Sequence, residues 1–160
     1  MTTEQVSYQP FPKLTGAFVA GRLKPGWKDL LWTATNHWLD AKTIAKFADE
    51  LASDDVRVEV ATAAIDGAEA ALRSVLEREA ATDETPDASV RERWMRVAVA
   101  WLYENRETYT DPWAVIEEVW EAFGHPESLN GLIRWMPPPP GGKPGEAGML
   151  ERWRDLAASQ

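Results

Sequence analysis

DPWAVIEEVWEAF, residues 111–123, carries the clearest helical signal in the chain. Asp111 before Pro112 is typical of a helix start, because an aspartate side chain accepts hydrogen bonds from the first backbone N–H groups and proline fits the first turn. The apolar residues that follow recur at helical spacing: Trp113, Ile116, Val119, Trp120 and Phe123. The stretch therefore predicts an amphipathic helix, which Gly124-His125-Pro126 should end.

The preceding residues 89–105 predict a second long helix. Ser89 and Glu92 have the spacing of a capping box, in which each side chain satisfies a backbone N–H group of the first turn. Six apolar residues share one face of this helix: Val90, Trp94, Val97, Ala98, Trp101 and Leu102. We therefore expect a helix from Ser89 to about Asn105.

Helical patterns also cover most of the remaining chain. Asp40 is the expected cap of one helix, and Asp66-Gly67 separates two alanine-rich segments. The alternation in VRVEVA, residues 56–61, also fits a strand, but the alanine run that follows favours a helix. Further helices are expected over residues 27–39, 41–51, 56–64, 68–80, 127–136 and 147–158.

These elements predict an all-α fold, a compact bundle of about seven or eight short helices in a single domain over residues 1–160. Residues 1–25 are expected to form an irregular arm, with one strand or helical turn near Phe18–Ala20. A Pro/Gly-rich loop over 137–145 should precede the C-terminal helix. Stacked helix pairs are the less favoured alternative, because no repeat period is visible.

Composition points to a soluble, cytoplasmic protein rich in aromatic residues. The chain has nine Trp and no Cys, so disulfides and thiolate chemistry are excluded. It contains no apolar run of the roughly 20 residues that a membrane span needs, and its start lacks the pattern of a secretory signal. Most of the tryptophans fall on helical stripes, and we interpret them as core residues.

The formal net charge of -9 is unevenly distributed. Residues 1–46 hold six Lys and Arg against three Asp and Glu, whereas residues 47–160 hold 11 against 23. Within 97–133, Arg106 is the only Lys or Arg among seven Asp and Glu. Such a field repels nucleic acid and anionic membranes and attracts a basic protein partner. Solvated acids that merely keep the protein soluble are the alternative interpretation.

The candidate partner-binding residues come from this acidic region. Glu117 and Glu121 stand four residues apart on one helical face with Glu118 beside them, a like-charge arrangement that a basic partner would relieve. Tyr109 lies off the apolar stripe and is flanked by acids, which suits contact with a cation. The full set is Glu104, Glu107, Tyr109, Asp111, Glu117, Glu118 and Glu121.

No catalytic, cofactor or metal site is predicted. The two histidines, His37 and His125, are isolated, and we interpret each as a side chain that bonds a helix end. His37 with nearby Asp40 is the minimal pair for acid–base chemistry, which keeps an enzyme as the least favoured hypothesis. Asp54-Asp55 and Asp83-Glu84 lack calcium-loop spacing and are interpreted as solvated.

Several segments, taken together, resemble the bacterial domain-of-unknown-function 2247 family. They are WKDLLWTATNHWLDAKTIAKFA (27–48), WLYENRETYTDPWAVIEEVWEAFGHPE (101–127) and IRWMPP (133–138). The chain departs from the family pattern at Gly124-His125 and at Trp120. The resemblance implies a small helical protein of bacterial toxin neighbourhoods, and it carries over no functional residue.

The favoured hypothesis is a non-enzymatic, immunity-like protein whose acidic surface, centred on residues 104–121, covers a basic toxin. The alternative is a helical scaffold or regulatory module unrelated to toxins. That module would use the Pro-rich segment 137–145 or the aromatic arm 8–27 as its contact. A stiff spacer that holds the last helix is the simpler interpretation of the proline run.

Overall fold

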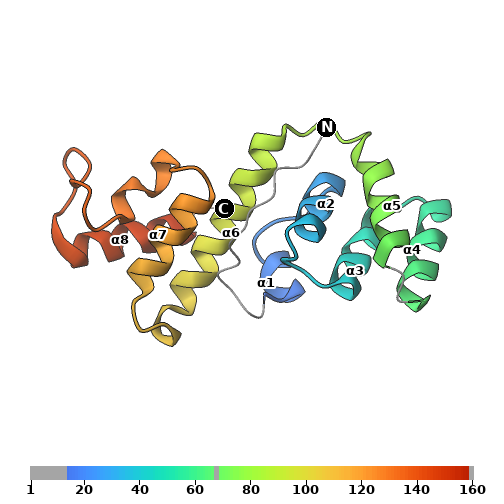
Figure 1. Cartoon of the computed structure of the whole chain (residues 1–160), viewed down its shortest axis with the longest axis horizontal. Coiled ribbons are helices and arrows are strands. Elements are labelled where there is room, and N and C mark those ends of the chain that lie inside the picture. The colour runs from blue at the N-terminus through green and yellow to red at the C-terminus, as the bar shows by residue number, and fades with distance from the viewer. Residues whose placement is uncertain (1–13, 67–68, 159–160) are drawn as a thin grey trace. The chain divides into compact units, whose positions relative to one another are not determined.

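The computed structural model describes residues 14–66 and 69–158. These residues form eight α-helices and two short 3-10 helices, and no strand occurs among them (Figure 1). The predicted all-α fold is therefore confirmed. The described residues group into two units, an N-terminal unit that ends at Arg91 and a C-terminal unit that begins at Glu92. A single domain over 1–160 stays a prediction, and most of the expected arm, residues 1–13, lies outside the described residues.

The N-terminal unit contains five complete helices. They are α1 (Gly16–Ala20), α2 (Trp27–Thr35), α3 (Ala41–Leu51), α4 (Asp54–Asp66) and α5 (Glu69–Ala80). Of the strand and the helical turn that were both expected near Phe18–Ala20, the structure shows the helical turn, as α1. The Thr15 side chain caps it by accepting a hydrogen bond from the Phe18 N–H. The alternating residues 56–61 lie in α4, so the strand alternative is excluded there.

The core of the N-terminal unit lies where α2 packs against α3 and α5, and α4 packs against those same two helices. Leu30, Ala48 and Leu76 are fully buried in it. Helix α2 ends at Thr35, earlier than predicted, because the chain turns at His37, whose φ is 59°, and the Trp38 N–H donates to the Thr33 carbonyl at 2.9 Å. Trp38 is nevertheless buried, in edge contact with Trp32 at 4.6 Å between ring centroids.

The loop between α5 and α6 corrects the interpretation of Asp83 as solvated. Its carboxylate accepts hydrogen bonds from the Thr85 N–H at 3.0 Å and from the Lys28 N–H at 3.1 Å. Burial raises the pKa of Asp83, but a hydrogen bond from the Thr85 hydroxyl at 2.7 Å, these two backbone hydrogen bonds and the charge of Lys28 together outweigh it, so the pKa lies below its usual value. The Lys28 ammonium also donates to the Thr85 carbonyl, so this loop is tied to the start of α2.

Helix α6 (Asp87–Glu104) begins in the N-terminal unit and continues into the C-terminal one. It starts two residues before the predicted capping box, and that prediction is wrong. The Pro86 carbonyl already accepts hydrogen bonds from the N–H groups of Ser89 and Val90, so Ser89 lies inside the first turn. Along residues 97–100 every side chain is fully buried, which means that α6 is enclosed on all of its faces there.

The C-terminal unit continues with η1 (Arg106–Thr108), α7 (Pro112–Ala122), η2 (Glu127–Leu132) and α8 (Gly145–Ala158). The predicted start of α7 is confirmed, because the Asp111 side chain accepts a hydrogen bond from the Ala114 N–H at 3.3 Å. Trp153 of α8 is fully buried at the centre of this unit. Its indole N–H donates to the Val99 carbonyl at 3.0 Å, and its ring lies 5.1 Å from that of Trp113.

The Pro-rich loop leads directly into α8, which starts at Gly145, two residues earlier than predicted. Arg152 of α8 holds the loop by donating from Nη1 to the Lys143 carbonyl at 2.8 Å and from Nε to the Gly131 carbonyl at 2.9 Å. Gly148 allows the close approach, since a Cβ there would lie 2.2 Å from the Lys143 carbonyl oxygen. These contacts support the interpretation of the proline run as a spacer that positions the last helix.

Candidate functional site

The predicted partner-binding residues all lie in the C-terminal unit, on α6, η1 and α7 and in the turn between η1 and α7. Glu104, at the end of α6, and Glu107, in η1, are exposed. On α7, Glu118 and Glu121 are exposed, whereas Glu117 is half-buried. The apolar stripe of α7 is buried as predicted, so the acids occupy the outward side of the helix.

Arg134 neutralises part of this acidic surface. Its guanidinium lies 3.0 Å from the Asp111 carboxylate and 3.8 Å from that of Glu117. Asp111 therefore caps α7 and binds a cation at the same time. Arg134 lies one residue beyond the stretch 97–133 in which Arg106 is the only Lys or Arg, so the sequence pattern did not reveal this compensation.

Glu118 and Glu121 remain uncompensated. Among the residues that the structure describes, neither has a Lys, Arg or His within ion-pair distance. Glu107 of η1 also has no such partner in the described ranges. The outward side of α7 therefore keeps a local excess of negative charge. Like charges three or four residues apart on a helix repel each other, so a basic partner would relieve this repulsion.

Trp135 is a large exposed side chain next to this acidic helix. It is 67% exposed, and its ring makes an edge contact with Trp120 of α7 at 5.4 Å between centroids. Trp120 is held in place by a hydrogen bond from its indole N–H to Asn130 Oδ1 at 3.1 Å and by the His125 ring at 4.1 Å. The indole of Trp135 is thus supported from beneath and open to solvent, as in an interface anchor.

Tyr109 and the two histidines do not come together in a common site. Tyr109 is half-buried and packs edge-on against Trp101 at 6.5 Å, and burial raises the pKa of its phenol. His37 and His125 are both exposed and both adopt a left-handed backbone with φ of 59° just after a helix. The Asp40 carboxylate accepts a hydrogen bond from the Thr43 N–H at 2.8 Å and forms no ion pair with His37.

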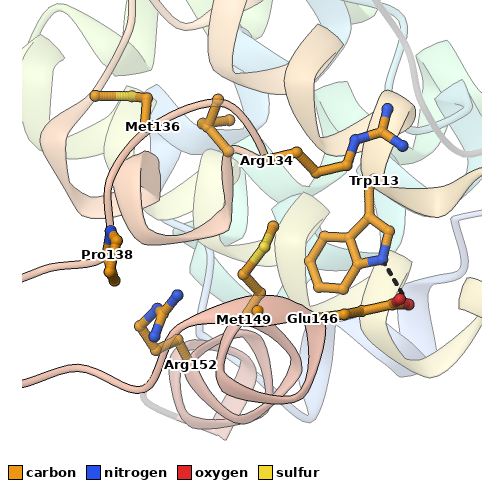
Figure 2. A pocket seen from close by; sticks show the side chains of 9 residues that line it. Trp113, Arg134, Met136, Pro138, Glu146, Met149 and Arg152 are labelled. Atoms are coloured by element: carbon orange, nitrogen blue, oxygen red, sulfur yellow. Dashed lines mark hydrogen bonds between the residues drawn. The ribbon is translucent and has the colours of Figure 1, made fainter.

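A pocket of about 410 Å³ lies in the same unit, between the Pro-rich loop, α7 and α8 (Figure 2). Its walls combine apolar side chains with three charged ones. The lining residues are Trp113, Ile133, Arg134, Met136, Pro138, Gly145, Glu146, Met149 and Arg152. The pocket was not predicted, because its residues come from segments that are up to 39 positions apart in the chain.

The described residues contain neither a metal-binding cluster nor a membrane-spanning helix. Within residues 14–66 and 69–158, no three His, Asp or Glu side chains lie close enough together to hold a metal ion. No helix in those ranges has both the length and the apolar character needed to cross a membrane.

Comparison with family models matches residues 16–157 to the family described as uncharacterized proteins conserved in bacteria, DUF2247. The chain belongs to this DUF2247 family. The resemblance seen in the sequence is thereby confirmed. No curated protein matches the chain, and no solved structure does.

The family match includes the segment Arg134-Trp135-Met136-Pro137, whose roles the structure now separates. Arg134 and Met136 line the pocket, while Trp135 contacts Trp120 and is exposed to solvent. This segment is one of the three that carry the resemblance to the family, and it was the one signal that could have directed attention to Trp135. Nothing in the sequence pattern singled out Glu146 or Arg152.

Proposed function

We propose that this protein is a non-enzymatic, cytoplasmic binding domain that contacts a basic protein partner through an acidic–aromatic surface. This surface consists of Glu118, Glu121 and Trp135. The observations that carry the proposal are the exposed Trp135 ring, which packs on Trp120 of α7, and two exposed carboxylates on the same helix that have no counter-ion among the described residues. A buried aromatic anchor with a charged rim is the usual composition of a binding hot spot.

The charges select the kind of partner. The net charge of -9 and the uncompensated face of α7 disfavour nucleic acid and anionic lipid and favour a basic protein surface. A lysine or arginine side chain of that partner would place its cation over the Trp135 indole and near Glu121. In its specific form, the proposal is an immunity role, in which the acidic–aromatic surface covers the basic substrate-binding surface of a bacterial toxin.

The alternative scaffold function finds less support in the contacts. The Pro-rich segment is occupied within its own unit, because Lys143 accepts a hydrogen bond from Arg152 and packs against Gly148. A partner that recognised 137–145 would have to compete with these contacts. The acidic–aromatic surface has no such competing contacts among the described residues.

The immunity role predicts that an adjacent reading frame encodes a large secreted protein with a variable C-terminal domain, and the test is growth rescue by co-expression with that domain. Wild-type protein should restore growth, and the double variant Glu118→Lys/Glu121→Lys should not. In stopped-flow mixing the double variant should associate about tenfold or more slowly, because electrostatic steering is lost, and the rate should depend less on salt. Trp135→Ala should mainly accelerate dissociation.

The matched control is Glu50→Lys/Glu84→Lys, which reverses two exposed acids of the N-terminal unit. It should rescue growth like the wild type. Equal association rates for both double variants would mean that the acidic–aromatic surface is not the contact. Failure of the wild-type protein to bind or neutralise the toxic domain would contradict the immunity role.

A further inference from the structure

The pocket of the C-terminal unit has opposite charges at its two ends. Glu146, Met149 and Arg152 follow one another along one side of α8, and Met149 lies between the two charged side chains (Figure 2). Arg152 lies six positions after Glu146 in the chain, which corresponds to about 9 Å along the helix axis. This spacing separates the charges by more than the contact distance of an ion pair.

The guanidinium of Arg152 is the cationic end. Its partners are the carbonyl oxygens of Gly131 and Lys143, so no carboxylate among the described residues neutralises it. An arginine has five N–H groups, and these two hydrogen bonds leave three for a ligand. Both bonds also fix the side chain, so its guanidinium is held in place before a ligand arrives.

The carboxylate of Glu146 is the anionic end. It accepts a hydrogen bond from the Trp113 indole N–H at 3.1 Å, and no cation lies within ion-pair distance in the described part of the chain. Arg134, which also lines the pocket, is already paired with Asp111 and Glu117. The two charges left without a counter-ion are therefore Arg152 and Glu146.

The wall between the two charges is apolar. It is formed by the Trp113 ring, Met136, Pro138 and Met149. A ligand that satisfies this pocket needs a carboxylate for Arg152, an ammonium for Glu146 and an apolar chain between them.

We infer that this pocket binds ω-amino carboxylates, the chemistry shared by a free ω-amino acid and by a C-terminal lysine of a protein. In the bound state the ligand carboxylate accepts hydrogen bonds from Arg152, and the ammonium donates to Glu146. The inference does not depend on the acidic–aromatic surface, because neither charged residue belongs to it.

Calorimetric titration of the full-length protein tests the inference with three probes of the same chain length. 6-Aminohexanoate should bind, while hexanoate, which lacks the ammonium, and hexylamine, which lacks the carboxylate, should each bind at least tenfold more weakly. Nα-acetyl-lysine models the end of a protein chain. Tighter binding of Nα-acetyl-lysine than of 6-aminohexanoate would identify a protein terminus as the source, and the reverse order would identify a free amino acid.

Two variants test which protein charge binds which end of the ligand. Glu146→Gln keeps an oxygen that can accept the Trp113 hydrogen bond but removes the charge, so it should abolish the preference for 6-aminohexanoate over hexanoate. Arg152→Gln should abolish the preference over hexylamine. The controls Asp155→Asn and Arg154→Gln alter an exposed ion pair elsewhere on α8 and should leave binding unchanged.

Arg152 also holds the Pro-rich loop, so Arg152→Gln could alter the fold. Its binding result counts only if its melting temperature, measured by circular dichroism, matches that of the wild type. Glu146→Gln and the three probes keep the test independent of that variant. Equal affinity for 6-aminohexanoate, hexanoate and hexylamine, or no binding of any probe, would overturn the inference. Binding that both control variants abolished would overturn it as well.

Discussion

The two units treat surface charge differently. In the N-terminal unit, three arginines on α4 and α5 pair with nearby acids: Arg57 with Asp49 and Asp54, Arg73 with Glu77, and Arg78 with Glu59 and Glu79. In the C-terminal unit, α7 contains no Lys or Arg, and Arg134 reaches only Asp111 and Glu117 from outside the helix. Helices α4 and α5 thus carry arginines that pair with several nearby acids, whereas α7 carries no cation of its own for Glu118 and Glu121.

The tryptophans divide in the same way. In the N-terminal unit, Trp32 and Trp38 are both buried and pack against each other. In the C-terminal unit, Trp153 is fully buried, while Trp135 is 67% exposed. The exposed ring packs on α7, the helix that carries Glu118 and Glu121, so the contrast between the tryptophans points to this region as the candidate contact surface.

The largest expected effect comes from the buried tryptophan of the C-terminal unit. Trp153→Ala removes a fully buried ring and its hydrogen bond to the Val99 carbonyl, and it should lower the free energy of unfolding by about 3–5 kcal/mol. Trp135→Ala should lower it by less than about 1 kcal/mol, because most of that ring is in solvent. Urea denaturation measures both. Similar losses would mean that Trp135 is a structural residue, and the contrast between the two rings would fail.

A smaller effect is expected from two glycines, one in each unit. Gly148→Ala places a Cβ 2.2 Å from the Lys143 carbonyl oxygen and should cost about 1–3 kcal/mol through displacement of the Pro-rich loop. At Gly21, φ is -73° and a Cβ meets only ordinary contacts of 3.6 Å. Gly21→Ala should therefore stabilise the protein by about 0.4–1 kcal/mol. Thermal unfolding compares the two variants, and a neutral Gly148→Ala would contradict the close packing of loop and helix.

The smallest effect concerns pH and the helix cap Asp40, the N-terminal unit's counterpart of Asp111. Hydrogen bonds from the Thr43 side chain and N–H group lower the pKa of Asp40 in the folded state. Its contribution to stability is therefore complete above the unfolded pKa of about 3.9 and is lost as pH falls through the lower folded value.

The variant Asp40→Asn tests this linkage, because asparagine also caps helices but does not titrate. Between about pH 5 and pH 2, the wild type should lose more stability than the variant in urea denaturation. Above about pH 5 the two should differ by less than about 1 kcal/mol. Parallel pH profiles of wild type and variant would show that the Asp40 carboxylate does not contribute in this way.

Helix starts were well predicted where the signal is a local one. Asp40 and Asp111 cap α3 and α7 as expected, because a cap depends on residues within one turn. The capping box at Ser89 is also a local motif, but the prediction from it was wrong. The Pro86 carbonyl accepts the first hydrogen bonds of the same helix, so the helix starts before Ser89.

The candidate site was predicted less completely than the fold. The acids of α7 were identified by charge alone, and the structure places Glu118 and Glu121 at the surface. The pairing of Arg134 with Asp111 and Glu117 was not predicted, since 23 and 17 positions separate these residues. Trp135 was grouped with a helix that stops at Leu132, so its exposure was missed.

The sequence by itself determined the all-α fold, most helix positions and the acidic character of residues 97–133, because helical periodicity, caps and charge are local or additive properties. Only the tertiary structure decided which acids keep their charge uncompensated, which tryptophan remains exposed and where the Pro-rich loop closes a pocket over α8. Those outcomes depend on contacts between residues far apart in the chain, such as Arg152 with Gly131 and Trp113 with Glu146. The spacing of residues along the sequence does not predict such contacts.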